Sequence, residues 1–418
     1  MSPIRNPQSA IQNRPIRVLY VLNAMGGGAS LGIYEMLRSR EHDAVVPFAV
    51  MPAGSETQEA RVRPLFEAMR VMPVPWWNRD AEAGWLRRGA YALGRWRHGI
   101  SQGRTRRAIE AVIEAWDIDL VHTGTALTVA GALAARARGV PHVWHIKEEI
   151  GQRGRVRFPY ADAKLVAYMT GLSERIIAMS AFIGRIFRTH DAGEKLAVVP
   201  DGVDLTPYRS GTSRALREEL GLKPGQLLVG MVASLTSIWK RHDVYVKMVG
   251  VLARRMPHVQ FLTIGLRPSS AQRWPYDLPR RRYEALEAFA HEHVPEGRLQ
   301  FLDFVPDPPD IMRSLDVLVH TCDVEPFGRI AIEAMAAQTP VVGPQTGGLA
   351  ETVVDGETGM LVAPNAPAAF AEATERLLGD EALRTRLGRA GRQRVIDHYT
   401  IEAHTERIHA LYREVLEG

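Results

Sequence analysis

Short apolar runs alternate with longer stretches rich in helix-forming residues along the whole chain. This alternation predicts buried strands joined by helices, as in a parallel α/β fold. The strands expected in the first half cover residues 17–22, 43–51, 120–122, 142–145, 175–179 and 195–199. Those expected in the second half cover residues 227–232, 260–264, 299–301, 317–320, 341–342 and 360–362. Each half is therefore expected to form its own doubly wound sheet.

Length also favours two domains, because a chain of 418 residues exceeds what one hydrophobic core usually serves. A turn at residues 200–204 and a polar stretch to residue 213 predict the linker. We expect an N-terminal domain over residues 15–200, a second domain over residues 205–395 and a C-terminal helical segment over residues 396–418. Four apolar residues form one stripe of that segment, namely Ile408, Leu411, Tyr412 and Leu416.

Composition favours a folded cytoplasmic enzyme. Hydrophobic residues make up 46% of the chain and charged residues 24%, which indicates neither a disordered nor a membrane-spanning protein. The sole cysteine, Cys322, excludes an internal disulfide framework and suits a reducing compartment. We interpret it as a small buried side chain rather than a nucleophile. The first apolar run is too short for a signal peptide or a transmembrane helix.

Charge is distributed unevenly along the chain. Residues 1–200 contain 27 Lys and Arg against 18 Asp and Glu, whereas residues 201–418 contain 25 against 29, so the first half should face an acidic partner. Arginines alternate with aromatic residues between residues 85 and 107, namely Trp85, Arg87, Arg88, Tyr91, Arg95, Trp96, Arg97, Arg104, Arg106 and Arg107. Two interpretations fit this segment equally: a contact with an anionic membrane surface, or a solvated helix with its aromatic side chains packed inward. Nucleic acid is not an expected partner, since we find no recognised binding motif.

Two glutamates stand where a loop enters a helix. Pro326 and Gly328 break regular structure, so the helix should begin near Gly328 and end before Pro340. Glu325 then lies just ahead of the helix and Glu333 about one and a half turns inside it. Free N–H groups at the start of a helix attract phosphate, and carboxylates accept hydrogen bonds from hydroxyl groups. This combination suits a nucleotide sugar.

A glycine-rich loop follows the first expected strand. It contains Gly26, Gly27 and Gly28 and leads into a helix expected over residues 31–38. Ligands of open parallel sheets bind at the carboxyl ends of the strands, and glycines let the backbone approach a ligand closely. The loop lacks the glycine spacing of a dinucleotide-binding fold, and an ordinary strand-to-helix turn explains it equally well.

Together these motifs resemble those of the retaining glycosyltransferases of the GT-B fold, in family 4 of the nucleotide-sugar-dependent enzymes (glycosyl transferases group 1). The most specific motif is the pair Glu325 and Glu333 with Phe-Gly following Pro326. The segments at residues 200–204 and 346–359 are similar to further family motifs. The resemblance covers residues 16–415. It implies two Rossmann-like domains facing across a cleft, with the C-terminal helix crossing back onto the first domain.

The resemblance also implies roles for individual residues. Glu325 matches the glutamate that holds sugar hydroxyls, and Glu333 matches the one that binds the ribose. Lys240 matches the lysine that neutralises the diphosphate leaving group. His145 matches the histidine near the 6-hydroxyl of the donor sugar. Further donor contacts are expected from Gly27, Gly28, Ser234, Arg241, Phe327, Gly328, Arg329 and Ile330. The family implies neither a metal nor another cofactor.

The chain departs from the family at Ser234, where family members usually have a second cation. Arg241 or Arg267 is expected to supply that charge in space. A hydrogen bond from the serine to phosphate and a weakened enzyme are the alternatives.

The resemblance implies transfer of a hexosyl unit from a UDP- or GDP-sugar to a sugar or lipid-linked acceptor, with retention at the anomeric carbon. No nucleophile is expected beneath the sugar, so front-face displacement is favoured over a covalent intermediate. The basic first half suggests a peripheral protein on the inner face of the cytoplasmic membrane, engaged in polysaccharide or glycolipid assembly. Two rivals remain, an epimerase or hydrolase of the same fold and a non-catalytic nucleotide-sugar-binding relative.

Overall fold

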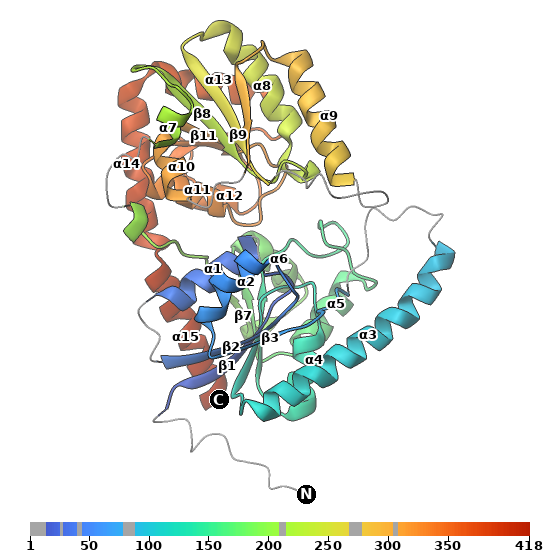
Figure 1. The fold of residues 1–418 in the computed structure, drawn as a ribbon. Coiled ribbons are helices and arrows are strands. Elements are labelled where there is room, and N and C mark those ends of the chain that lie inside the picture. Colours follow the sequence, from blue (N-terminus) through green and yellow to red (C-terminus); the bar gives the residue numbers. More distant parts are fainter. Residues whose placement is uncertain are drawn as a thin grey trace, which may run out of the picture. The chain divides into compact units, whose positions relative to one another are not determined.

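A computed structural model describes residues 14–25, 28–39, 44–77, 88–208, 215–266, 278–303 and 308–418. The chain divides into two compact units. The first combines Met1–Gly202 with Ile401–Gly418, and the second covers Val203–Thr400. Each unit consists of a parallel sheet with helices packed on it (Figure 1). Among the described residues, no helix has both the length and the apolar character needed to cross a bilayer.

The described part of the first unit contains a seven-stranded parallel sheet in the order β3-β2-β1-β4-β5-β6-β7. Its strands are β1 (Ile16–Val21), β2 (Val45–Met51), β3 (Ala68–Val71), β4 (Leu120–Thr123), β5 (His142–Ile146), β6 (Arg175–Ala178) and β7 (Leu196–Val198). Its helices are α1 (Gly28–Arg38), α2 (Glu56–Val62), η3 (Arg63–Leu65), α3 (Arg88–Ala115), α4 (Ala130–Arg138), α5 (Asp162–Thr170), α6 (Ala181–Thr189), η5 (Gly193–Lys195) and α15 (Ile401–Glu417). The direction of winding reverses between β1 and β4, and ligands of open α/β sheets bind beside such a reversal.

The described part of the second unit contains a six-stranded parallel sheet in the order β10-β9-β8-β11-β12-β13. Its strands are β8 (Leu227–Val232), β9 (Val259–Ile264), β10 (Leu299–Leu302), β11 (Val317–Val319), β12 (Val341–Pro344) and β13 (Gly359–Val362). Its helices are η6 (Thr206–Tyr208), α7 (Ala215–Glu219), η7 (Ile238–Lys240), α8 (His242–Arg255), α9 (Leu278–His293), α10 (Pro308–Ser314), α11 (Arg329–Ala336), α12 (Leu349–Thr352), α13 (Pro367–Gly379) and α14 (Glu381–His398). Its winding reverses between β8 and β11, the strands that precede the Lys240 and Glu325 loops.

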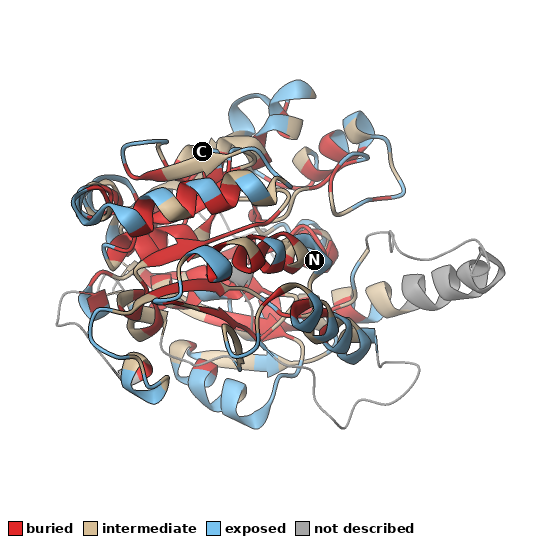
Figure 2. Ribbon diagram, turned by 90° about the horizontal axis from the view of Figure 1, so that it is seen from above, coloured by how far each residue is buried: buried red, intermediate tan, exposed pale blue. Residues whose placement is uncertain are grey.

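The strands are mostly continuous apolar runs because helices cover both faces of a parallel sheet. All residues of β4 and β5 are buried, and Figure 2 shows burial concentrated in the sheets and on the inner faces of the helices. The α/β prediction is confirmed, and each of the strands expected from the sequence forms. The strand β3 was not expected, because it is a short edge strand with an exposed Arg70 and no fully buried residue. The helix after the glycine loop begins at Gly28 rather than Leu31.

The C-terminal helix α15 packs in the first unit, as the resemblance implied. The Tyr412 hydroxyl lies 2.6 Å from Nδ1 of His122 on β4 and 3.3 Å from the hydroxyl of Tyr20 on β1. Ile408 and Leu416 of the expected apolar stripe are buried in the same core, whereas Leu411 is only partly buried. The helix therefore completes the hydrophobic core of a unit whose other elements lie two hundred residues or more earlier in the chain.

The buried imidazole of His142 makes the first unit sensitive to acid. Its ring nitrogens lie 2.8 Å from Oγ1 of Thr123 and 2.8 Å from Oγ of Ser173, and burial lowers its pKa from 6.5 to about 3. The unfolded chain therefore binds more protons than the folded chain between these two pH values. The stabilisation is complete above pH 6.5 and is lost progressively as the pH falls toward 3. Each pH unit within this window should cost about 1.4 kcal/mol of unfolding free energy.

Urea unfolding at a series of pH values checks this prediction. In His142→Asn, the slope of the unfolding free energy against pH should be smaller below pH 6.5, by the equivalent of about one bound proton. The variant should also be less stable overall. The matched control is His258→Asn, which removes an exposed histidine and should leave the slope unchanged. Equal slopes in the wild type and His142→Asn would contradict the assignment.

Candidate active site

The loop between β11 and α11 carries Glu325 and ends at Gly328. Gly328 has a φ of 103°, a left-handed conformation that glycine adopts without steric cost, and its carbonyl oxygen accepts the N–H groups of Ala331 and Ile332. The helix begins at Arg329, one residue after the predicted start, and ends well before Pro340. The N–H groups of the first turn are thus presented at the end of the Glu325 loop.

Glu325 Oε2 is bound by two nitrogen atoms. Nζ of Lys240 lies 2.8 Å from it, and Nε2 of His320 also lies 2.8 Å from it. Burial raises the pKa of Glu325, but the charge of Lys240 and the hydrogen bond from His320 outweigh burial and hold the pKa well below its ordinary value. The carboxylate is therefore ionised at neutral pH and has a second oxygen for a ligand.

His320 links Glu325 to the sole cysteine. Burial lowers the pKa of His320, but hydrogen bonds with Cys322 and Glu325 more than compensate and leave the pKa raised. Cys322 is fully buried, as expected for a packing residue, and its Sγ lies 3.1 Å from the carbonyl oxygen of Val324. One ligand atom from each of His320, Cys322 and Glu325 lies within 4.8 Å of the others, which is close enough for a metal ion. Lys240 already contacts the Glu325 oxygen, so the geometry fits an ion pair better than a metal centre.

Glu333 lies on the buried face of α11. Its Oε1 is 2.9 Å from Nε of Arg329, one helical turn earlier. The side chain of Glu333 keeps 9% of its surface exposed, which leaves the carboxylate at the border of solvent. Phe327 is buried and packs edge-on against Tyr399, whereas Ile330 is half-buried. The side chain of Phe327 is thus a structural anchor, and its expected contact with a donor is through the backbone.

The turn before α12 fixes the backbone of the Glu325 loop. The N–H of Gly348 donates to the carbonyl oxygen of Glu325 at 2.7 Å. A β-carbon on Gly348 would clash with the carbonyl group of Pro326, so only glycine allows this close approach. The segment at residues 346–359, which resembles a family motif, therefore holds the backbone of Glu325 in place.

Gly348→Ala should force the Glu325 loop to shift. Overpacking of this kind costs about 1 to 3 kcal/mol, and the displaced loop should weaken donor binding. Thermal unfolding and titration with UDP measure the two effects. The control Gly379→Ala adds a methyl group in open space and should change neither property. Unchanged stability and UDP affinity in Gly348→Ala would contradict this account of the turn.

Lys240 ends the short helix η7 in the loop between β8 and α8. Oγ1 of Thr321 donates to the carbonyl oxygens of Lys240 at 3.0 Å and Arg241 at 2.9 Å, which attaches this loop to the end of β11. Ser234 is exposed, and its Oγ lies 3.3 Å from Oγ1 of Thr236. Ser234 stands where family members usually have a second cation, and its hydroxyl group is therefore accessible at the surface of this loop.

Arg241 is engaged with carboxylates. Its guanidinium donates two 2.8 Å bonds to Asp243 and one of 2.8 Å to Asp323, and it also contacts Asn365. The charge that Arg241 was expected to supply in place of Ser234 is therefore already paired with two carboxylates. Arg267, the other expected substitute, lies outside the described residues.

The remaining expected residues belong to the first unit. His145 is buried at the end of β5, with its ring centroid 5.4 Å from that of His122 and 6.2 Å from that of His404. Burial and then the charge of Lys147 lower the pKa of His145 well below its ordinary value, so its ring is neutral. Neither ring nitrogen has a hydrogen-bond partner among the described residues. Gly28 starts α1, and Gly27 lies outside the described residues.

The structure adds a buried ion pair that the sequence did not predict. Nζ of Lys147 lies 2.8 Å and 3.1 Å from the two carboxylate oxygens of Asp201, and both side chains are almost fully buried. The neighbouring Glu148 accepts from Oγ1 of Thr125 at 2.5 Å and from the N–H of Ala126 at 2.9 Å. Lys147 and Glu148 are therefore structural residues in the first unit.

Family models match both units. The model for "Glycosyl transferases group 1" matches residues 212–394, and the model for "Glycosyltransferase Family 4" matches residues 32–207.

Curated relatives are about one third identical to the chain over the aligned residues. A D-inositol 3-phosphate glycosyltransferase of Nocardia farcinica is 34% identical over 66% of this chain and 56% of that protein. One of Segniliparus rotundus is 31% identical over 73% of this chain and 68% of that protein. The chain thus spans between about half and two thirds of the length of these relatives.

Solved structures share the fold at lower identity. The complex of Anabaena HepE with UDP-glucose has a TM-score of 0.75 and 19% identity, over 96% of this chain and all of the other. Sucrose-phosphate synthase of Thermosynechococcus elongatus has a TM-score of 0.69 and 19% identity, over 96% of this chain and 99% of the other.

Proposed function

We propose that this chain, which belongs to the group 1 glycosyltransferases of the GT-B fold, transfers a hexosyl unit from a nucleoside diphosphate sugar with retention at the anomeric carbon. The observation that carries the proposal is the contact of Lys240 with Glu325 at the loop that leads into α11. A cation, an ionised carboxylate and the N–H groups of a helix start are thereby gathered at the carboxyl ends of adjacent strands, β8 and β11.

Each group has a place in donor binding. The free oxygen of Glu325 would accept hydrogen bonds from sugar hydroxyls, and Glu333 would accept those of the ribose. The first turn of α11 would bind the diphosphate through backbone N–H groups. Lys240 contacts Glu325, and its ammonium group would bind a phosphate at the helix start while it remains paired.

The transfer step follows front-face displacement. The oxygen of the acceptor hydroxyl bonds to the anomeric carbon while the bond from that carbon to the phosphate oxygen breaks. The electron pair of the broken bond goes to the phosphate, and the acceptor's proton moves to the same leaving oxygen. Lys240 and the N–H groups of α11 would stabilise the negative charge that grows there. His145, neutral and with both ring nitrogens unpartnered among the described residues, would hydrogen-bond a hydroxyl of the donor sugar.

A UDP-sugar is the proposed donor, because the similar HepE structure contains UDP-glucose. No metal or other cofactor is part of the proposal, since Lys240 supplies the cation. The proposed acceptor is a sugar or a lipid-linked sugar, and the relatives named for inositol 3-phosphate favour a hydroxyl-rich acceptor with an anionic group.

Stereochemistry tests the proposal. The enzyme should convert an α-linked donor into an α-linked product with release of nucleoside diphosphate, as observed by proton NMR of the anomeric signals. A β-linked product would contradict retention. Free or epimerised sugar formed from the donor alone would instead identify a hydrolase or an epimerase.

Peripheral attachment to the inner face of the membrane remains a proposal. Residues 85–87 and the side chains of residues 88–100 lie outside what the structure describes. The later part of α3 has exposed Arg104 and Arg107 beside buried Thr105 and Ile109. Thr105 donates to the carbonyl oxygen of Pro73, so this end packs on the first unit with its arginines outward. We expect flotation with vesicles rich in phosphatidylglycerol and none with phosphatidylcholine. Equal flotation with both vesicles, or with neither, would contradict the attachment.

A further inference from the structure

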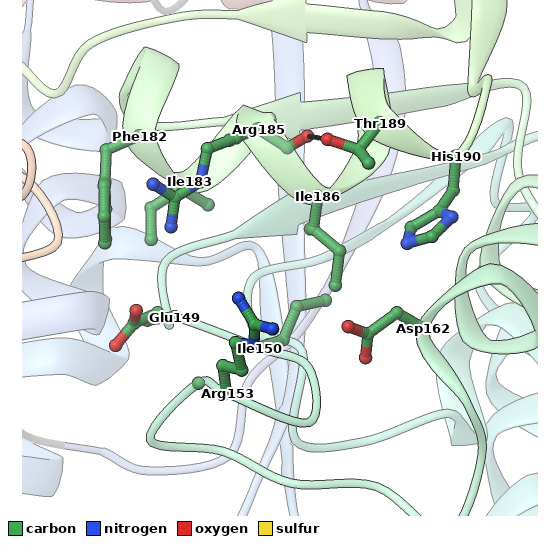
Figure 3. A pocket seen from close by; sticks show the side chains of 11 residues that line it. Glu149, Ile150, Arg153, Asp162, Phe182, Ile183, Arg185, Ile186, Thr189 and His190 are labelled. Carbon is green, nitrogen blue, oxygen red and sulfur yellow. Dashed lines mark hydrogen bonds between the residues drawn. The ribbon is translucent and has the colours of Figure 1, made fainter.

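A cavity of 530 Å³ lies in the first unit, beside the carboxyl ends of β5 and β6. The loop after β5 forms one wall and helix α6 forms the opposite wall (Figure 3). The start of α5 closes one side through Asp162. The volume is in the range of small-molecule sites, and the position is where open α/β sheets bind their ligands.

Two arginines enter the cavity from opposite walls. Arg153 extends from the loop and Arg185 from α6, and their guanidinium groups point toward one another in Figure 3. Neither guanidinium has a hydrogen bond or an ion pair with another described residue, although that of Arg185 lies 4.8 Å from the ring centroid of Phe182. Since neither guanidinium is paired with a carboxylate among the described residues, an anion between the two would be attracted by both charges. The planar donors of two guanidinium groups suit the oxygen atoms of a phosphate.

The other residues that line the cavity indicate a ligand with hydroxyl groups rather than one with several negative charges. Glu149 and Asp162 flank the two arginines in Figure 3. Asp162 accepts the N–H of Gln152 at 2.8 Å through Oδ1 and has a second oxygen for a ligand. A ligand with several phosphates would be repelled by these carboxylates, whereas hydroxyl groups would donate to them. Ile150 and Ile186 supply an apolar surface of the kind on which a sugar or polyol ring packs.

We propose that this cavity binds a phosphorylated, hydroxyl-rich molecule, with the phosphate held between Arg153 and Arg185 and the hydroxyl groups facing Glu149 and Asp162. Its role as the anionic part of the acceptor rests on the function proposed above. The binding chemistry is the same for a soluble phosphorylated sugar and for the headgroup of a glycolipid precursor.

Calorimetric titration of the full chain with glucose 6-phosphate tests the proposal, with UDP present in excess so that the donor site is filled. Binding should weaken about tenfold or more in Arg153→Gln and in Arg185→Gln, since each variant loses charge-assisted hydrogen bonds. The matched control is Arg188→Gln, which changes an exposed arginine of the same helix that does not line the cavity. It should bind as the wild type does, and UDP affinity should be equal in all four proteins.

The remaining measurements separate the possible sources of the phosphate and the possible causes of failure. If the ligand is a lipid headgroup, the wild type should bind vesicles of phosphatidylinositol and Arg185→Gln should not. If the ligand is a soluble sugar, the wild type should bind glucose 6-phosphate but not the vesicles. Glu149→Gln should weaken glucose 6-phosphate and leave inorganic phosphate unchanged, which confirms that the cavity is intact. Equal affinities of all variants, or no binding of either probe to the wild type, would overturn the proposal. Failure of UDP to bind would instead contradict the proposed function.

Discussion

Asp201→Ala should lower the unfolding free energy of the first unit by about 3 to 5 kcal/mol. The substitution leaves the ammonium group of Lys147 buried with no counter-charge, and removal of one partner of a buried ion pair costs far more than the pair itself contributes. A β-carbon on Gly32 would lie 2.9 Å from Oδ2 of Asp201 and 3.0 Å from Nζ of Lys147, so α1 covers the pair closely.

The double variant Lys147→Met with Asp201→Leu separates charge from packing. It should be much more stable than Asp201→Ala, because no uncompensated charge remains. Glu375→Gln is the matched control, since it removes one partner of the exposed Arg255–Glu375 pair and should cost less than about 1 kcal/mol. Urea unfolding monitored by tryptophan fluorescence measures all three. A cost of less than 1 kcal/mol for Asp201→Ala would contradict burial of the pair.

Lys240→Met should reduce kcat by about 100- to 1000-fold. In the proposed mechanism this lysine stabilises the departing diphosphate, and in the structure it pairs with the charge of Glu325. Its effect should appear mainly in kcat, because the charge on the leaving oxygen is greatest in the transition state. Initial rates of nucleoside diphosphate release at a range of donor concentrations separate kcat from KM.

Two further variants test whether this role belongs to Lys240 alone. Lys240→Arg keeps the charge and should retain more activity than Lys240→Met. Lys223→Met removes an exposed lysine of the second unit and should leave both kinetic constants unchanged. A loss confined to KM in Lys240→Met would show that the lysine binds the donor equally in the ground and transition states.

The fold was largely predictable because burial on both faces of a parallel sheet makes its strands continuous apolar runs. This signal located β1 and β8, whose residues are almost all buried. It was absent in β3, where an edge position leaves every residue at least partly exposed. Contacts between segments far apart in the chain could not be predicted from the sequence pattern either. The return of α15 to the first unit was inferred from the family resemblance, since its apolar stripe indicates burial without naming the surface that it covers.

The local structure of the candidate site was predictable where its residues are close in sequence. Glu325, Gly328 and Glu333 form a local motif, and the structure places the start of α11 one residue after the predicted position. His320 was missed even though it precedes Glu325 by only five residues, because a polar residue that ends a strand has no distinctive sequence signal. Asp323 lies 82 residues from Arg241, and Asp201 lies 54 residues from Lys147, so only the fold brings each of these pairs together.

Titration of UDP, GDP and ADP into the wild type and Glu333→Gln tests the central claim, a nucleoside diphosphate site at α11. At least one nucleotide should bind the wild type, and Glu333→Gln should weaken it about tenfold or more because the ribose hydroxyls lose a charged acceptor. Lys223→Met should bind as the wild type does. Equal affinity in the wild type and Glu333→Gln, or no binding of any of the three nucleotides, would contradict the claim.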